Sequence, residues 1–152
     1  MSQPEERKLS KHPTDVLIRA LAQRQLNPTA QNVIHIVERM AEAPFPTVSS
    51  HLWRRLRDEQ WSRDTTEDQY LDDLRRAVRH RDTRICIYQR RGGNLAAALA
   101  ATHLVVQPCR LGDCSEQLLF VVYSADRGII ISGYQVSSLE ALGLPKEVVW
   151  LR

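Results

Sequence analysis

The chain is poor in cysteine and contains no long apolar run. Its three cysteines among 152 residues are too few, and too odd in number, for a disulfide scaffold, which favours a reducing compartment. No apolar stretch approaches the roughly 18 residues that a transmembrane helix needs. The opening segment MSQPEERKLSKHP holds two glutamates and no hydrophobic segment, so it is not typical of a secretory signal. We therefore expect a cytoplasmic protein with no membrane contact.

The sequence also lacks the short motifs of several common enzyme classes. Walker A, GxGxxG, HExxH and GxSxG are absent, which argues against nucleotide hydrolysis, dinucleotide redox chemistry, zinc proteolysis and α/β-hydrolase chemistry. Cys109 and Cys114 could supply two metal ligands, but a structural zinc site needs four. Only Cys86 and His103 are near enough in sequence to complete such a set, and free thiols near a loop are the alternative. We expect no cofactor and no bound metal.

Arginine is the residue type present in excess. Lys8, Lys11 and Lys146 are the only lysines, so 18 of the 21 basic residues are arginine, and the formal net charge is +3. A GC-rich genome would produce this bias without a functional reason, and selection for planar, bidentate phosphate binding would produce it too. Because the net charge is modest, the distribution of the arginines is more informative than their number.

The first half of the chain has the periodicity of helices. After a polar tail over residues 1–12, which we expect to be disordered, Thr14 can cap a first helix and Thr29 a second. The second helix carries apolar residues at the i, i+3, i+4, i+7 spacing of a buried stripe. Thr66 and Gln69 form the capping-box pattern of a later helix. Four helices are predicted, at about residues 14–26, 30–43, 49–60 and 67–80.

From Arg84 onward the apolar pattern becomes that of strands. RICIYQ, HLVVQ, EQLLFVVYS and GIIISGYQV are each typical of a strand. NLAAALAAT is ambiguous, because alanine favours helix while the preceding RRGG favours a strand returning from a turn. We predict a strand that runs through to Gln107. A short helix and a tail follow, in which Trp150 and Leu151 are expected to cover the sheet.

The order of these elements predicts an α+β fold. N-terminal helices would pack on a C-terminal antiparallel sheet of about four strands. We expect a single domain over residues 13–152, with a helical part at 13–81 and a sheet part at 83–152.

An arginine-rich span crosses the predicted boundary between the helices and the sheet. RRAVRHRDTRICIYQRR contains one acidic residue, Asp82. Positive charge concentrated at a helix-to-sheet junction and at a hairpin end suits a phosphate backbone. The alternative is a solvated face whose arginines pair with Asp72, Asp73 and neighbouring acids. The candidate nucleic-acid-binding residues are Arg75, Arg76, Arg79, Arg84, Arg90 and Arg91.

A second candidate site lies on the second predicted helix. His35, Glu38 and Arg39 face one side of this helix by their i+3 and i+4 spacing, with His35 at the edge of the apolar stripe. A histidine in this position can be a general acid or base near neutral pH, assisted by an arginine that holds a phosphate. The alternative is a hydrogen-bonded boundary residue without a catalytic role.

The third candidate is the apolar hairpin YSADRGIIISGY. Its SADRG segment can form a tight turn that projects Arg127 from the sheet edge. Strand alternation places Ile130, Ser132 and Tyr134 on one face, and Gly133 would let a backbone or a ligand approach closely. The two hydroxyls could hold a phosphate or orient a ribose 2′-OH. They could equally be structural, with Ser132 bonded to a carbonyl and the Tyr134 hydroxyl in water.

The order of these parts resembles the toxin-like domains of the barnase, EndoU, colicin and RelE ribonuclease superfamily. In several of those domains a helix supplies histidine and arginine, and a late strand similar to VVYSADRGIIISGY supplies a hydroxyl residue and often a tyrosine. The resemblance implies metal-independent RNA cleavage by attack of the ribose 2′-OH on its own phosphate, and an antitoxin or immunity protein as partner. The histidines would act as acid and base, the arginines would bind the phosphate, and the hydroxyls would position it. The implied catalytic set is His35, Arg39, His103, Arg127, Ser132 and Tyr134.

Two classes of function follow from these observations. The leading hypothesis is a toxin-like ribonuclease or another RNA-acting domain, and it requires that His35 and Arg39 converge with Ser132 and Tyr134 in one cleft. The competing class is a non-catalytic interaction module, such as an immunity or adaptor protein, or a helical nucleic-acid-binding protein that uses residues 14–60.

Overall fold

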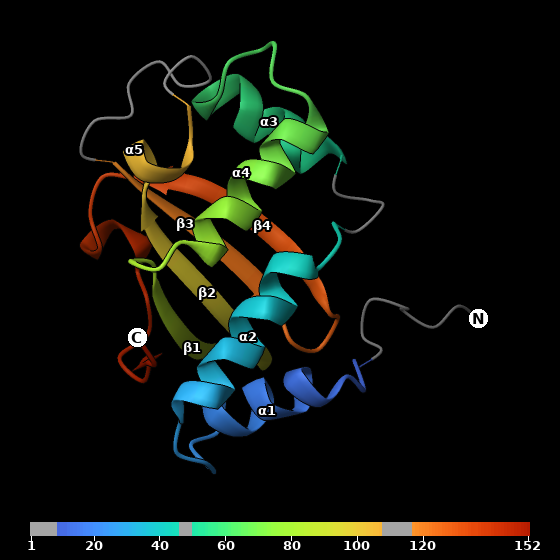
Figure 1. The fold of residues 1–152 in the computed structure, drawn as a ribbon, viewed down its shortest axis with the longest axis vertical. Coiled ribbons are helices and arrows are strands. Elements are labelled where there is room, and N and C mark those ends of the chain that lie inside the picture. Colours follow the sequence, from blue (N-terminus) through green and yellow to red (C-terminus); the bar gives the residue numbers. More distant parts are fainter. Residues whose placement is uncertain (1–8, 46–49, 108–116) are drawn as a thin grey trace.

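The first half of the protein is helical, as predicted. The computed structural model describes residues 9–45, 50–107 and 117–152 (Figure 1). Within these ranges, no helix is both long enough and apolar enough to cross a bilayer. The helices of the first half are α1 (Pro13–Ala22), α2 (Ala30–Glu42), α3 (Ser50–Gln60) and α4 (Glu67–Arg79).

Side-chain caps fix the starts of three of these helices. Thr29 caps α2 through a bond of 3.1 Å from a helix amide to its hydroxyl. Thr66 and Gln69 form the predicted capping box of α4, with bonds of 2.9 and 3.1 Å. The prediction for α1 was wrong, because His12 rather than Thr14 is the cap and its Nδ1 accepts the Thr14 amide at 3.1 Å. A proline at the first helical position moves the start of α1 ahead of the threonine.

The second half forms an antiparallel sheet of five strands, which confirms the α+β class. The spatial order is β4-β3-β2-β1-β5, so the last strand returns to the outer side of the first. This last strand is an addition to the predicted sheet of about four, and it pairs with Cys86 and Ile87. The strands are β1 (Arg84–Arg90), β2 (Gly93–Ala101), β3 (Leu118–Ser124), β4 (Ile129–Val136) and β5 (Val149–Trp150).

The predicted strand through Gln107 was wrong in its last part. β2 ends at Ala101, and Thr102–Val105 forms one helical turn, α5. The amide and the hydroxyl of Thr102 both donate to the carbonyl of Gln117, at 2.9 and 3.0 Å. The apolar pattern of HLVVQ misleads because the chain instead closes a helical turn here, in which the Val106 amide donates to the Thr102 carbonyl at 2.9 Å.

Both faces of the sheet are covered. Figure 1 shows α1, α2 and α4 lying across one face, which we call the helix face. On the opposite or far face, side chains such as Cys86, Phe120 and Val122 form a second core with Leu142 of the short 3₁₀ helix η4 (Glu140–Leu142). Strands buried on both sides have few polar positions, which explains the continuous apolar runs of β2 and β3.

Because of a bulge in β4, its side chains lie on other faces of the sheet than predicted. Val122 pairs with Ser132 whereas Tyr123 pairs with Ile130, so β4 has one residue more than β3 at this point. Ile130 consequently belongs to the helix-face core, while the ring of Tyr134 packs edge-on against Phe120 of the far-face core and also contacts the helix-face core. The strict alternation that placed these side chains on one face was therefore wrong.

The absence of a side chain at Gly133 allows α4 to pack closely on β4. A Cβ at this position would lie 2.3 Å from Leu74 Cδ2 and 2.7 Å from its Cδ1. The hydroxyl of Tyr70, also on α4, donates to the Gly133 carbonyl, and burial raises the pKa of that hydroxyl. The space predicted for a ligand at Gly133 is thus filled by Leu74.

Side-chain and loop contacts close the outer edge of β4. The carboxamide of Gln60 pairs with the backbone of Gln135 like a neighbouring strand, with bonds of 3.3 Å to its carbonyl and 2.7 Å from its amide. The Ile130 amide donates to the Pro44 carbonyl at 3.0 Å. These contacts satisfy edge groups that could otherwise pair with a foreign strand.

We expect Gly133→Ala to lower the free energy of unfolding by about 1–3 kcal/mol, because the added methyl overlaps Leu74. Leu74→Ala should also destabilise the protein, but the methyl at position 133 would then enter the space that the leucine leaves. The double variant should therefore lose less free energy of unfolding than the two single variants lose together, by roughly 0.5 kcal/mol or more. Urea denaturation of the four proteins measures this coupling, and strict additivity would contradict the close contact.

Candidate functional site

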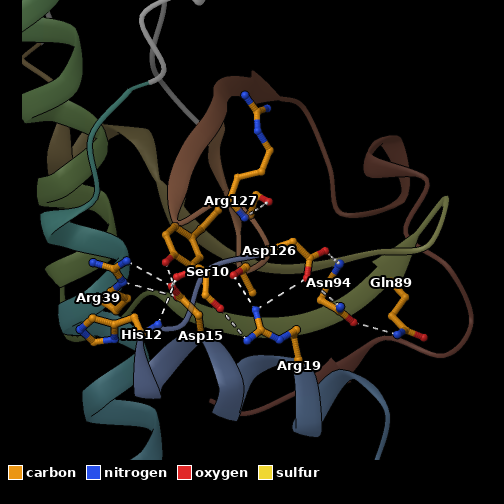
Figure 2. A network of polar contacts seen from close by, with 12 residues as sticks. Ser10, His12, Asp15, Arg19, Arg39, Gln89, Asn94, Asp126 and Arg127 are labelled. Atoms are coloured by element: carbon orange, nitrogen blue, oxygen red, sulfur yellow. Dashed lines mark hydrogen bonds and ion pairs between the residues drawn. The ribbon is translucent and has the colours of Figure 1, made fainter. Parts of the chain in front are cut away.

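A buried polar network lies where α1 and α2 meet the turn between β3 and β4 (Figure 2). Asp15 is fully buried, and its carboxylate accepts hydrogen bonds from the hydroxyls of Ser10 and Tyr123. Arg39 adds an ion pair, with Nη2 3.1 Å from Asp15 Oδ2 and Nε 3.4 Å from Oδ1. A buried carboxylate is tolerated only with a paired cation and satisfied lone pairs, and this one has both.

A second carboxylate extends the network along the turn. Arg19 Nη1 lies 3.1 Å from the Ala125 carbonyl oxygen and 3.8 Å from Asp126 Oδ1. Asp126 also accepts the backbone amide of Asn94 at 2.9 Å and its carboxamide at 3.0 Å. The network thereby joins α1 to two hairpins of the sheet, as Figure 2 shows.

The network also changes the extent of the folded domain. The Ser10 amide donates to the Asp126 carbonyl, and His12 caps α1. Residues 9–12 were predicted to belong to a disordered tail, and the structure instead ties them to the domain through these bonds. Residues 1–8 lie outside the described ranges.

Burial and neighbouring charge hold two members of the network in one protonation state. Partial burial lowers the pKa of Arg39, but the hydrogen bond to Asp15, and the charges of Tyr123 and Asp15, raise it overall. Burial raises the pKa of Tyr123, and the bond to the Asp15 carboxylate raises it further. A general acid or base works best with a pKa near the working pH, so this arginine and this tyrosine are suited to a structural role.

His35 lies on the exposed side of α2 and not in this network. Its Nε2 is 3.2 Å from Nε2 of Gln31, one turn earlier. Arg39, one turn later, points to Asp15 and is used by the ion pair (Figure 2). The predicted pair shares a helix but is not directed at a common centre.

Ser132 and Tyr134 lie on the far face of the sheet. Tyr134 packs edge-on against Phe120, with ring centroids 5.7 Å apart. Burial raises the pKa of Tyr134, and the neighbouring Arg90 guanidinium opposes this shift. Arg39 is bonded to Asp15 on the helix face, whereas Ser132 pairs with Val122 of the far-face core, so these side chains do not point to a common cleft.

Arg127 and His103 stand apart from both groups. Arg127 is exposed on the turn between β3 and β4, and Figure 2 shows its side chain pointing away from Asp15 and Arg39. His103 is exposed on α5, beyond the other end of β2. The nine residues of β2 extend over about 26 Å at ~3.3 Å per residue, so these two side chains belong to opposite ends of the sheet.

Two of the candidate arginines are engaged within the helical layer. Arg75 is half-buried and donates to the Ala43 carbonyl at 3.2 Å. Arg76 pairs with Asp72 at 2.8 Å, as the solvated-face alternative predicted. Asp73 does not join that face, because it is buried and accepts an indole N–H at 3.1 Å.

The remaining candidates divide between the two ends of β1. Arg84 begins the strand and Arg90 ends it, about 20 Å away at ~3.3 Å per residue. Arg90 donates to the Gly143 carbonyl at 2.8 Å, and Arg91 occupies the hairpin turn with a left-handed φ of 53°. The predicted arginine surface is therefore two separate clusters.

The cluster at the start of β1 gains a residue from the end of the chain. Arg152 Nε donates to the Thr83 carbonyl at 2.9 Å and its Nη2 approaches the His80 carbonyl at 3.5 Å. This places Arg152 beside the turn that joins α4 to β1. We call the exposed arginines Arg79, Arg81, Arg84 and Arg152 the basic junction.

The basic junction has little compensating negative charge. Arg81 pairs with Asp82 at 3.9 Å, and both side chains are largely exposed. Within the described ranges, none of the ion pairs involves Arg79, Arg84 or Arg152. These three arginines of the basic junction are therefore available to an external anion.

An aromatic ring adjoins the basic junction. The guanidinium carbon of Arg84 lies 3.9 Å from the centroid of the Trp150 ring. Trp150 was predicted only to cover the sheet, and Arg152 was not among the predicted site residues. No sequence signal reveals that these two residues lie beside Arg84, because only the pairing of β5 with β1 brings them there.

No metal centre is found in the part of the chain that the structure describes. There, no three histidine, cysteine or acidic side chains gather closely enough to hold an ion. Cys86 is buried on the far face, and burial raises the pKa of its thiol to about 12. Cys109 and Cys114, the other candidate ligands, lie outside the described ranges.

Comparison with known proteins returns no matching family model, curated protein or solved structure.

We expect Asp15→Asn to lower the free energy of unfolding by about 3 kcal/mol, because it removes the charge that compensates Arg39 in a buried setting. Asp58→Asn is a matched control, since Asp58 pairs with Arg57 at 3.2 Å on the surface and should change stability by less than ~0.5 kcal/mol. Urea denaturation measures both. Equal effects of the two substitutions would contradict the role given to the buried network.

Proposed function

We propose that this protein is an RNA-acting domain that binds RNA through the basic junction. The observation that supports the proposal is a cluster of exposed guanidinium groups at the join of α4 and β1, with one long ion pair among them. Guanidinium groups bind phosphate oxygens in a bidentate manner, and several of them on one surface release counterions when a phosphate backbone binds.

The local structure supports this use of the cluster. The Arg152 side chain is held by two backbone carbonyls, and the Arg84 side chain rests on Trp150. Less side-chain freedom is lost when such groups bind a ligand, so part of the entropic cost of association is already met. Arg79 and Arg81 lie at the end of α4 and can adjust to the phosphate spacing.

RNA cleavage remains a prediction that rests on the resemblance to toxin-like ribonucleases. Its catalytic set includes His35 and Arg39 on α2 together with Ser132 and Tyr134 on β4, and these four side chains are not directed at one centre. For this reason we propose binding as the activity and assign no catalytic role to that set. Cleavage by those four residues in one step would need a rearrangement of the sheet.

Fluorescence anisotropy with a labelled single-stranded RNA of 20 nucleotides, in EDTA, tests the proposal. If the protein contacts four phosphates, raising the salt concentration from 50 to 200 mM should weaken the affinity roughly 50-fold. The double variant Arg79→Glu/Arg81→Glu should bind roughly tenfold or more weakly, with a smaller salt slope. Both arginines are exposed, so the fold should be retained, which circular dichroism can verify.

The matched control is Arg54→Glu/Arg55→Glu on α3, which changes the net charge equally at two other exposed arginines. It should leave the affinity within about threefold of the unsubstituted protein. Equal loss in both double variants, or binding that does not depend on salt, would contradict the basic junction as the site. RNA recovered from the same samples should be intact, and cleavage lost in His35→Ala would instead favour the predicted ribonuclease.

A further inference from the structure

A groove beside the basic junction combines apolar walls with a few polar groups. It runs between the α1–α2 connection and the edge strand β5 and encloses about 450 Å³. Leu26 and Pro28 form one side, and Val149 and Trp150 form the other. We call it the Trp150 groove. Its volume falls within the range of small-ligand pockets, which are lined mainly by apolar groups.

The exposed side chain of Leu26 needs an explanation. It is 52% exposed although it lines the groove. Isolated exposed leucines are common on protein surfaces, but this one lines the same groove as Trp150. A flat apolar ligand between Leu26 and Trp150 would cover both.

Polar groups in the groove are few and suitably placed. Asn27 lines it, and no hydrogen bond within the described ranges engages the Asn27 carboxamide. Arg24 lines it as well, with a left-handed φ of 58° and one bond of 3.0 Å from Nη2 to the Glu147 carbonyl. A carboxamide has both donors and acceptors and can pair with the edge of a nucleobase, whichever base it is.

The charge around the groove selects among flat ligands. Arg84 stacks on Trp150, so the basic junction begins at the wall of the groove. Arg24 adds a cation inside it, and Glu147 is the nearest acid in sequence to this wall. A neutral or anionic flat group attached to phosphates fits this pattern better than a cationic one.

We propose that the Trp150 groove holds one unstacked base of a single-stranded nucleic acid whose phosphates lie on the basic junction. The proposal rests on the RNA binding proposed above and specifies the form of the ligand. Bases stack readily on aromatic rings and on guanidinium planes, and Trp150 lines the groove while Arg84 lies beside it. A duplex keeps its bases paired and stacked, so it reaches the cations but not the groove.

The direct test compares three labelled probes on the unsubstituted protein at one salt concentration. They are a single strand of 12 nucleotides, a strand of equal length and charge made of abasic spacers, and a 12-base-pair duplex. We expect the base-bearing strand to bind roughly tenfold or more tightly than the abasic strand. It should also bind more tightly than the duplex.

Two exposed leucines give a matched pair of variants. Leu26→Ala should weaken binding of the base-bearing strand roughly fivefold and leave the abasic strand unaffected, whereas Leu104→Ala on α5, 46% exposed, should change neither. Trp150→Phe should retain most of the binding, and Trp150→Ala should lose it. Thermal denaturation of each variant separates loss of a contact from loss of fold.

The outcomes distinguish this inference from the proposed function. Equal, salt-dependent binding of the base-bearing and abasic strands would overturn the base site while the basic junction stands. Duplex binding as tight as single-strand binding would also overturn it. If none of the probes binds, the proposed function fails and the base site fails with it.

Discussion

Both faces of the sheet are buried, and this burial determines where a ligand can reach the protein. Helices cover one face and the chain after β4 covers the other, so the middle strands have no surface for a ligand. Polar chemistry is confined to the ends and edges of the sheet. Gln60 and Pro44 satisfy backbone groups at the β4 edge, whereas the β5 edge carries Trp150 and Arg84.

The charged residues of the protein accordingly have two distinct uses. Asp15 and Arg39 form a buried pair that joins α1, α2 and β3, and their charges compensate each other inside the fold. Arg79 and Arg84 are exposed and have no ion pair within the described ranges. An arginine beside a buried aspartate stabilises the fold, and an arginine without one remains available for phosphate. This difference, and not the number of arginines, distinguishes the candidate interface.

Features that depend on neighbouring residues could be predicted from the sequence. The capping box of α4, the cap of α2 and the strand β1 follow from local patterns, and so does the arginine-rich join of helix and sheet. Features that depend on distant residues could not. The bond between Asp15 and Tyr123 joins positions 108 residues apart, and no local pattern marks the bulge that moves Tyr134 to the far face. The predicted catalytic cleft required His35 and Arg39 to reach Ser132 and Tyr134, and such an encounter between a helix and a distant strand has no local sequence signal.

The central claim is that nucleic acid meets this protein at the β5 edge of the sheet. The most direct test is a titration of isotope-labelled protein with a single-stranded RNA of 12 nucleotides, followed through backbone amide chemical shifts. We expect the largest shifts at residues 24–27, 79–84 and 148–152, which are far apart in sequence and adjoin one edge of the sheet. Shifts centred on His35 and Arg39, or the absence of any shift at low salt, would contradict it.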